Sequence, residues 1–309
     1  EQLDIQRVIS KPISIQRLTL ALKNLHQSSH DSLSEQSRGS EQPPLENFKS
    51  QLNVLLVDDN PINRKLAKTM LQQVLPLSSI IEAEDGIQAV KIFQDKPAEL
   101  VLMDIQMPGI SGYQASKQIR TLPFGEQATI IALTAGTVKG ERERCLEAGM
   151  DEYLSKPIVL QSLKNTVLSL ISPETTASDL SAPINHDSQE HFNPEDFMEN
   201  LGVVQNNEVQ QLVQQLISQL EEELPLFLQA CQQQDLTNLH QLGHKHKSST
   251  AMIGMHRLSN LFLAIETQPT FDQAKFDSLI QEIQQEIQTV KAKADSFFQH
   301  GGRPNRVTA

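Results

Sequence analysis

Short apolar runs separated by helix-length amphipathic segments fill residues 52–171, and this alternation restricts the fold more than any other feature. The runs are apolar almost throughout, as expected for strands covered on both faces. They lie at Val54–Val57, Ile80–Glu82, Leu100–Met103, Thr129–Leu133 and Tyr153–Leu154. The pattern predicts an α/β fold with a five-stranded parallel sheet. Asn60 and Pro61 have the residue types of an N-cap and a first helical position, which predicts a helix directly after the first strand.

Residues 193–298 have almost no strand signal and carry apolar stripes at helical spacing. One stripe is Leu212, Val213, Leu216, Ile217, Leu220 and Leu224, and another is Ile280, Ile283, Ile287 and Val290. This pattern predicts an antiparallel, all-α helical bundle. Residues 299–309 are expected to form a tail.

Two polar segments divide the chain. Residues 26–50 and 172–192 are rich in Ser, Gln and Pro and are interpreted as linkers. They separate a head (residues 1–25) from a central domain (51–171) and a helical domain (193–298). The head segment Val8–Ile13 repeats the pattern of Tyr153–Ile158, including Ser-Lys-Pro-Ile. We therefore interpret the head as the end of an earlier, degenerate copy of the central fold and the chain as part of a longer protein.

Charge and composition exclude several classes. The formal net charge of −12 argues against a nucleic-acid partner. No apolar window is long enough for a transmembrane helix, so no membrane contact is expected within these residues. Cys145 and Cys231 are far apart in sequence, which favours a reducing compartment such as the cytoplasm.

Polar side chains follow four of the five predicted strands, at the point where each strand ends. They are Asp58 and Asp59 after the first strand, Asp104 after the third, Thr134 at the end of the fourth and Lys156 after the fifth. Ligands of open parallel sheets bind beyond the carboxyl ends of the strands. We therefore expect these residues to form one site.

Three carboxylates in one site repel one another unless a cation lies among them, and Mg²⁺ with oxygen ligands fits that need. Lys156 and the Thr134 hydroxyl would then serve an anion, for which phosphoryl is the obvious candidate. Each feature alone has a simpler explanation in turn or strand-end chemistry. Their occurrence together, in this order, favours a functional site.

The segments VLLVDDNPINR, LVLMDIQMPGISGYQA, IIALTAG and YLSKPI resemble the motifs of the response-regulator receiver domain over residues 52–171. The resemblance implies a flavodoxin-like fold with Asp104 as phosphoacceptor. It implies that Asp59, Asp104 and the Gln106 carbonyl hold Mg²⁺ and that Asp58 acts through water. It further implies that Thr134 and Lys156 contact the phosphoryl oxygens and that Tyr153 is the switch aromatic that moves with the threonine.

Three histidines, His240, His244 and His246, lie on one predicted helix. At about 100° per residue, His246 falls on the apolar stripe and is expected to face the bundle, whereas His244 is expected to point to solvent. Lys247 follows His244 by three residues and Ser248 by four. A partner could therefore approach an imidazole that has a cation beside it. An exposed histidine alone would be unremarkable.

The segment His244–Gly254 resembles the histidine-phosphotransfer (HPt) motif, which implies that His244 is phosphorylated with Lys247, Ser248 and Gly254 in support. Pro225 in the preceding helix and Ile265-Glu266 downstream also fit this family, whose fold is a four-helix bundle. Two positions depart from it: His246 stands where an apolar residue is usual, and Ser248 stands where glycine is usual. A buried His246 would weaken the bundle or introduce pH sensitivity.

A receiver followed by an HPt module resembles the C-terminal part of tripartite hybrid sensor histidine kinases of the BarA/GacS type. The resemblance implies transfer from an upstream kinase histidine in the same parent chain to Asp104, then to His244, and then to a downstream response regulator. It also implies a parent protein in the bacterial inner membrane. No Gly-rich nucleotide motif occurs, so we expect no autophosphorylation from ATP by these residues.

Two other functions are weaker. A phosphohydrolase with an aspartyl intermediate would be expected to carry an acid two residues after its nucleophile, where this chain has Gln106. A receiver acting as a non-catalytic interaction scaffold would tolerate loss of the acidic residues, yet all are present.

Overall fold

The computed structural model describes residues 52–135, 140–171, 192–201 and 206–299. All of these residues belong to one compact unit, Gln51–Ala309. The predicted head, the first linker and nearly all of the second linker lie outside the described residues. The domain boundaries therefore remain predictions. None of the described helices is long and apolar enough to cross a membrane.

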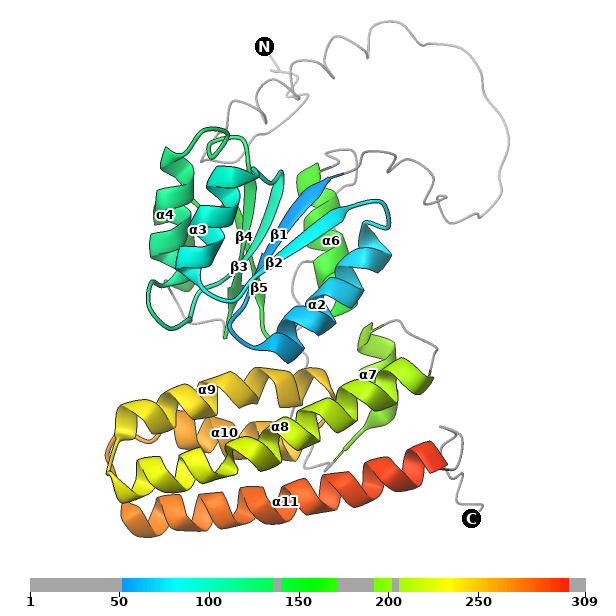
Figure 1. Ribbon diagram of the computed structural model, residues 1–309, viewed down its shortest axis with the longest axis vertical. Coiled ribbons are helices and arrows are strands. Elements are labelled where there is room, and N and C mark those ends of the chain that lie inside the picture. Colours follow the sequence, from blue (N-terminus) through cyan, green and yellow to red (C-terminus); the bar gives the residue numbers. More distant parts are fainter. Residues whose placement is uncertain (1–51, 136–139, 172–191, 202–205, 300–309) are drawn as a thin grey trace, which may run out of the picture. The chain divides into compact units, whose positions relative to one another are not determined.

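The described residues before 172 form a parallel sheet with strand order β2-β1-β3-β4-β5 (Figure 1). The strands are β1 (Asn53–Val57), β2 (Ser79–Ala83), β3 (Leu100–Asp104), β4 (Thr129–Thr134) and β5 (Glu152–Ser155). The helices are α2 (Pro61–Val74), α3 (Gly86–Asp95), α4 (Gly112–Thr121), α5 (Glu141–Glu147) and α6 (Leu160–Ile171). The predicted five-stranded parallel sheet is confirmed.

Helices cover both faces of the sheet, which explains why its strands are continuously apolar. Figure 1 shows α3 and α4 on one face and α2 and α6 on the other. All residues of β3 are buried, and β1 is buried from Val54 onward. Because β1 pairs with both β2 and β3, the strand order reverses beside β1, and the carboxyl ends of β1 and β3 lie next to each other there. This is the place where open α/β sheets bind ligands.

Helix α2 begins as the sequence predicts. The Oδ1 atom of Asn60 accepts from the Ile62 N–H at 2.9 Å, and Pro61 is the first helical residue. This cap satisfies one of the N–H groups that a helix start leaves without a backbone partner. The cap also fixes the direction in which the chain leaves β1.

Arg120, at the end of α4, ties together the opposite, amino edge of the sheet. Its guanidinium donates at 2.5 to 2.8 Å to three backbone carbonyls and one carboxylate, those of Gly125, Ala128, Gly149 and Asp151. A planar guanidinium with five donors can hold several loop acceptors at once. One side chain thus joins the segments that lead into β4 and β5.

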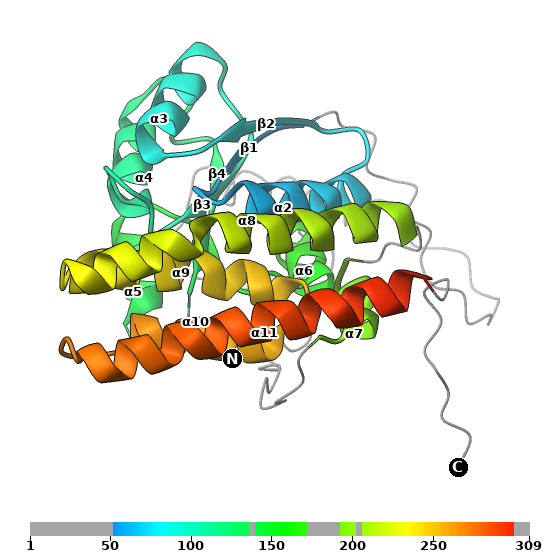
Figure 2. The ribbon, with the colours of Figure 1, turned by 60° about the horizontal axis from the view of Figure 1, so that its bottom comes forward.

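The C-terminal described residues are helical and form α7 (Pro194–Leu201), α8 (Asn206–Gln232), α9 (Leu236–Met252), α10 (His256–Glu266) and α11 (Gln273–Gln299). Helices α8 to α11 pack in a closed circuit, each against two others (Figure 2). The predicted helical bundle is confirmed. Both apolar stripes are buried, except that Leu224 is only half-buried. Gln299, assigned to the tail, is the last residue of α11, and Phe192, assigned to the linker, is buried.

The turn between α9 and α10 requires glycine. Gly254 has a φ of +77°, and a Cβ atom placed there would lie 2.4 Å from the carbonyl oxygen of Asn193. The Gly254 carbonyl accepts from the Asn193 N–H at 2.9 Å. Gly254 therefore joins the α9–α10 turn directly to the residue before α7.

Candidate functional site

The residues predicted from the strand ends converge at the carboxyl edge of the sheet. The Nζ atom of Lys156 lies 2.7 Å from Asp58 Oδ2 and 2.6 Å from Asp104 Oδ2. Asp58, Asp59 and Asp104 each offer a carboxylate oxygen, and these atoms lie within 4.8 Å of one another. The expected contact between Lys156 and Asp104 is confirmed.

Burial shifts the pKa values of the ionisable groups in this cluster. Asp58 and Asp104 are buried, as is the side chain of Lys156. Burial raises the pKa of Asp104 to about 7, although Lys156 beside it acts in the opposite direction. Burial alone would lower the pKa of Lys156, but the carboxylates of Asp104 and Asp58 outweigh it and raise that pKa above its usual range. The lysine is therefore charged at neutral pH.

One ammonium group cannot balance three carboxylates. Burial, and then the neighbouring Asp58, raise the pKa of Asp59. A hard divalent cation offsets such a surplus of acidic oxygens, and oxygen atoms are the ligands that Mg²⁺ prefers. The donor set of Asp58, Asp59 and Asp104 fits that ion.

The remaining predicted receiver residues lie in the loop after β3, at the end of β4 and on β5. The Gln106 N–H donates to Asp104 Oδ1 at 3.2 Å, which holds the loop after β3 against the carboxylate. Thr134 is buried at the end of β4, and its carbonyl accepts from the Lys156 N–H at 2.6 Å. Tyr153 is half-buried and packs against the sheet core. Thr134 occupies the strand end expected from the sequence pattern, whereas Gln106 and Tyr153, which the receiver resemblance implied, lie in the loop after β3 and on β5.

His244 lies on α9 in contact with an acid from α10. Its Nδ1 atom is 2.8 Å from Glu266 Oε1, and Lys247 Nζ is 2.5 Å from Glu266 Oε2. Burial would raise the pKa of Glu266, but the hydrogen bonds from His244 and Lys247 outweigh it and lower that pKa. The His244 side chain is only 15% exposed, so the prediction that it points to solvent was wrong. The helical wheel of α9 alone does not include Glu266, which reaches His244 from α10.

His246 faces the bundle as predicted and is fully buried. Its ring packs against Phe227 and Phe262, and its Nε2 atom lies 3.0 Å from Glu223 Oε2 on α8. Lys245 Nζ contacts both oxygens of the same Glu223 at 2.9 Å. Burial would raise the pKa of Glu223, but the bonds from His246 and Lys245 lower it to about 2. Sequence reasoning missed Glu223, because no local spacing relates α8 to α9.

Helix α2 packs against α9 within the compact unit. The Nδ2 atom of Asn60 donates to the Lys245 carbonyl at 2.9 Å and lies 3.4 Å from the Ser249 Oγ atom. The charges of Lys156, His244 and Lys245 all act to lower the pKa of Asp59, though burial and Asp58 outweigh them. The charge of His244, the histidine that the HPt motif implies is phosphorylated, therefore acts on a carboxylate of the acidic cluster.

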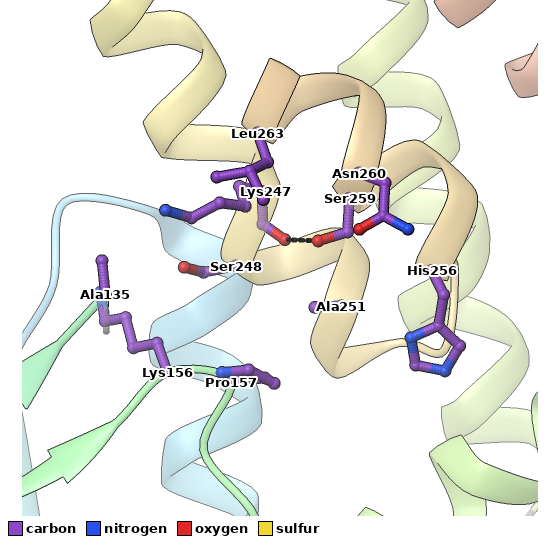
Figure 3. Close-up of a pocket in the computed structure, with 10 residues that line it drawn as sticks. All are labelled: Ala135, Lys156, Pro157, Lys247, Ser248, Ala251, His256, Ser259, Asn260 and Leu263. Atoms are coloured by element: carbon purple, nitrogen blue, oxygen red, sulfur yellow. Dashed lines mark hydrogen bonds between the residues drawn. The ribbon is translucent and has the colours of Figure 1, made fainter. Parts of the chain in front are cut away.

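A pocket of about 180 Å³ lies beside this contact. Figure 3 shows Lys156 and Pro157 on one side of it, and Lys247 and Ser248 on the other. The dashed bond in Figure 3 runs from Ser259 Oγ to the Lys247 carbonyl, at 2.9 Å. Lysines from the sheet domain and from the bundle therefore border the same space. Ser248, which lines that space, is 3% exposed.

Family models match both domains. Residues 54–168 match the response regulator receiver domain, and residues 211–293 match the Hpt domain. Signal transduction histidine-protein kinase BarA of Escherichia coli K12 is 39% identical over 126 residues, covering 41% of this chain and 14% of BarA. Sensor histidine kinase GacS of Pseudomonas protegens is 34% identical over 163 residues, covering 52% of this chain and 17% of GacS. The chain thus matches less than a fifth of the length of these relatives.

Among solved structures, the receiver domain of sensor histidine kinase PA1611 from Pseudomonas aeruginosa PAO1 is 37% identical, with a TM-score of 0.37. The match covers 40% of this chain and 98% of that domain, which was crystallised with a magnesium ion in its active site cleft. The matched families agree with the sheet and the bundle described above. The chain thus carries a region that matches the response regulator receiver domain at residues 54–168, followed by a region that matches the Hpt domain at residues 211–293.

Proposed function

We propose that Asp104 accepts a phosphoryl group from the phosphohistidine of a kinase domain and passes it to His244, which donates it to a separate response regulator. The observation that carries this proposal is the position of Lys156, within 2.7 Å of both Asp58 and Asp104 at the carboxyl edge of the sheet. A buried lysine beside a buried nucleophile supplies positive charge where the transferred oxygens would lie. The relatives BarA and GacS are named as histidine kinases, which supports a kinase histidine as the phosphoryl donor.

The first step exchanges one bond for another. A carboxylate oxygen of Asp104 attacks phosphorus in line, the P–N bond of the donor phosphohistidine breaks, and a P–O bond forms. Asp58, Asp59 and Asp104, with the Gln106 carbonyl, would hold Mg²⁺, which when bound neutralises phosphoryl oxygens. Lys156 and the Thr134 hydroxyl contact the remaining phosphoryl oxygens. Tyr153 moves together with Thr134 when Asp104 is phosphorylated.

The second step reverses this chemistry within the same chain. A ring nitrogen of His244 attacks the acyl phosphate, the P–O bond to Asp104 breaks, and a P–N bond forms. Lys247, held by Glu266 beside His244, supplies charge to the phosphoryl group once it has moved. Both steps need positioning and charge but little proton transfer, so no further general base is required.

Labelling with radioactive acetyl phosphate and Mg²⁺ tests the proposal, because this small donor releases acetate as it phosphorylates a carboxylate. The wild-type chain should acquire base-labile label on aspartate and then acid-labile label on histidine. Asp104→Asn should lose both labels, and His244→Gln should lose only the acid-labile one. Acid-labile label that survives in Asp104→Asn would contradict the proposal.

Two matched controls sharpen the assignment. Asp95→Asn removes an exposed acid at the end of α3 and should change neither label. His240 lies one turn before His244, and its Nε2 atom contacts the Gln268 carbonyl. His240→Gln should keep the acid-labile label. If His240→Gln lost that label and His244→Gln kept it, His240 would be the acceptor.

A non-catalytic scaffold predicts a different result. Such a receiver would take no label and would not bind beryllofluoride, a small phosphate mimic, in the presence of Mg²⁺. The intact cluster of Asp58, Asp59, Asp104 and Lys156 favours the relay. Saturable, Mg²⁺-dependent beryllofluoride binding that Asp104→Asn abolishes would exclude the scaffold.

A further inference from the structure

Asn60 uses every hydrogen-bonding group it has, and these groups point in two directions. Within the receiver, its N–H donates to Asp58 Oδ1 at 2.9 Å, and its Oδ1 atom caps α2 through the Ile62 N–H. Towards the HPt domain, its Nδ2 amide donates to the Lys245 carbonyl at 2.9 Å and lies 3.4 Å from Ser249 Oγ. The residue is fully buried, so water does not compete for these bonds.

Helix capping does not explain the amide. A cap needs only a side-chain oxygen, and serine, aspartate and asparagine cap helices about equally well. The Nδ2 group contributes nothing to the cap or to Asp58, and its partners are two atoms on α9. What asparagine adds to the other capping residues is therefore an amide that donates to the HPt helix α9.

The two acceptors on α9 both lie within five residues after the relay histidine. Lys245 directly follows His244, and Ser249 lies one turn further along the same face, with no exposed surface. The Ser249 hydroxyl donates to the His246 carbonyl at 3.1 Å and is therefore free to accept from Asn60. A backbone carbonyl within a helix has a fixed place, so a bond to it fixes the helix rather than a mobile side chain.

We propose that Asn60 is a positioning residue that sets the register of α9 against the receiver, so that His244 meets the phosphoryl group on Asp104. This inference rests on the proposed relay. Asn60 touches neither the phosphoryl group nor either phosphorylated residue. It links Asp58 in the acidic cluster to the residue next to His244 through two hydrogen bonds. Its N–H donates to Asp58, and its Nδ2 amide donates to the Lys245 carbonyl.

Asn60→Ser tests this inference, because serine keeps the cap and the backbone N–H to Asp58 but removes the amide. With radioactive acetyl phosphate, labelling of Asp104 should proceed at the wild-type rate. Transfer from Asp104 to His244 should slow by about tenfold, the effect of losing two buried hydrogen bonds. A structural defect in the receiver would slow the first step as well, and that result would overturn the inference.

Two further variants separate register from packing. Lys65→Ala removes a bond from the exposed side of α2 to Gln215 on α8, and transfer should stay within about twofold of wild type. Ser249→Ala should slow transfer in the wild-type chain but have no further effect in Asn60→Ser, because the two residues share one bond. Independent effects of the two substitutions would contradict the inference.

The outcomes also distinguish the inference from the proposed function. If Asp104→Asn still delivers label to His244, the relay itself is wrong. If the relay holds and Asn60→Ser transfers phosphoryl at the wild-type rate, only the role of Asn60 is wrong.

Discussion

The Nδ1 atom of His244 lies 2.8 Å from Glu266 Oε1, and this contact determines which ring nitrogen can react. The Glu266 carboxyl has a lowered pKa and is ionised, so it can only accept a hydrogen bond. A neutral His244 therefore carries its hydrogen on Nδ1 and has its lone pair on Nε2. In the proposed relay, Nε2 is the nucleophile.

We expect Glu266→Ala to slow phosphoryl transfer to His244 by about tenfold, because the imidazole loses the partner that fixes its tautomer and orientation. Glu266→Gln should recover part of the rate, since an amide oxygen can still accept from Nδ1–H. Single-turnover transfer from phosphorylated Asp104 measures both variants. Equal rates for Glu266→Ala and the wild type would show that the contact has no part in transfer.

Mg²⁺ binding should depend on pH near neutrality. Burial raises the pKa of Asp104 to about 7, and a protonated carboxyl binds a cation poorly. Affinity should therefore fall as the pH drops from about 8 to about 6, with proton release on binding at the lower pH. Calorimetry in buffers of different ionisation enthalpy measures both quantities. Asp104→Asn should remove the proton release, and an affinity that does not change with pH would contradict this account.

Acid should destabilise the bundle through His246. Burial lowers the pKa of this imidazole below its usual 6.5, although Glu223 opposes the shift. The folded state therefore binds fewer protons than the unfolded state. The stabilisation is fully present above about pH 6.5 and is lost as the pH falls toward the lower folded pKa. The slope approaches about 1.4 kcal/mol per pH unit.

Urea unfolding of the wild type and His246→Leu at several pH values measures this effect. Leucine removes the titrating group while Glu223 keeps its contacts with Lys245. The difference in unfolding free energy between the wild type and His246→Leu should therefore change across this pH range. The charged groups that act on the ring are Glu223 on α8, Lys245 on α9 and Asp59 after β1, whereas α10 contributes Phe262. Parallel pH dependence in both chains would assign the acid sensitivity to other groups.

Gly254→Ala should destabilise the chain by more than the backbone strain alone. The positive φ costs about 1–2 kcal/mol for any L-residue other than glycine. The new methyl group would also meet the Asn193 carbonyl at 2.4 Å, which should add about 1–3 kcal/mol. Gly109→Ala is a matched control, since Gly109 has a φ of +80° and no atom within 4 Å of the added Cβ. If the two variants lost the same unfolding free energy in urea, the α9–α10 turn would accommodate the new methyl group without an energetic penalty.

The receiver site could be predicted because each of its residues adjoins a strand end. Asp58, Asp104 and Lys156 are far apart in sequence, but parallel strands bring their carboxyl ends to one edge, so local patterns were enough to place them together. The burial of His246 followed in the same way from the apolar stripe of α9. In both cases one periodic element held the information.

Contacts between elements could not be predicted in this way. The pairing of His246 with Glu223 depends on how α8 is rotated about its axis relative to α9, and no spacing along the chain encodes that angle. His244 was expected in solvent because α9 was considered without α10. The second role of Asn60 was hidden for a different reason: its local sequence, Asn-Pro at a helix start, already explains the residue completely.

The Arg120 contacts have a mechanical consequence. They fasten loops at the amino edge of the sheet, whereas the buried acids and Lys156 lie at the carboxyl edge. Four hydrogen bonds from one side chain therefore brace the chain where it enters β4 and β5. Loss of the Arg120 guanidinium would loosen both strands at once, at the end of the sheet away from the acidic cluster.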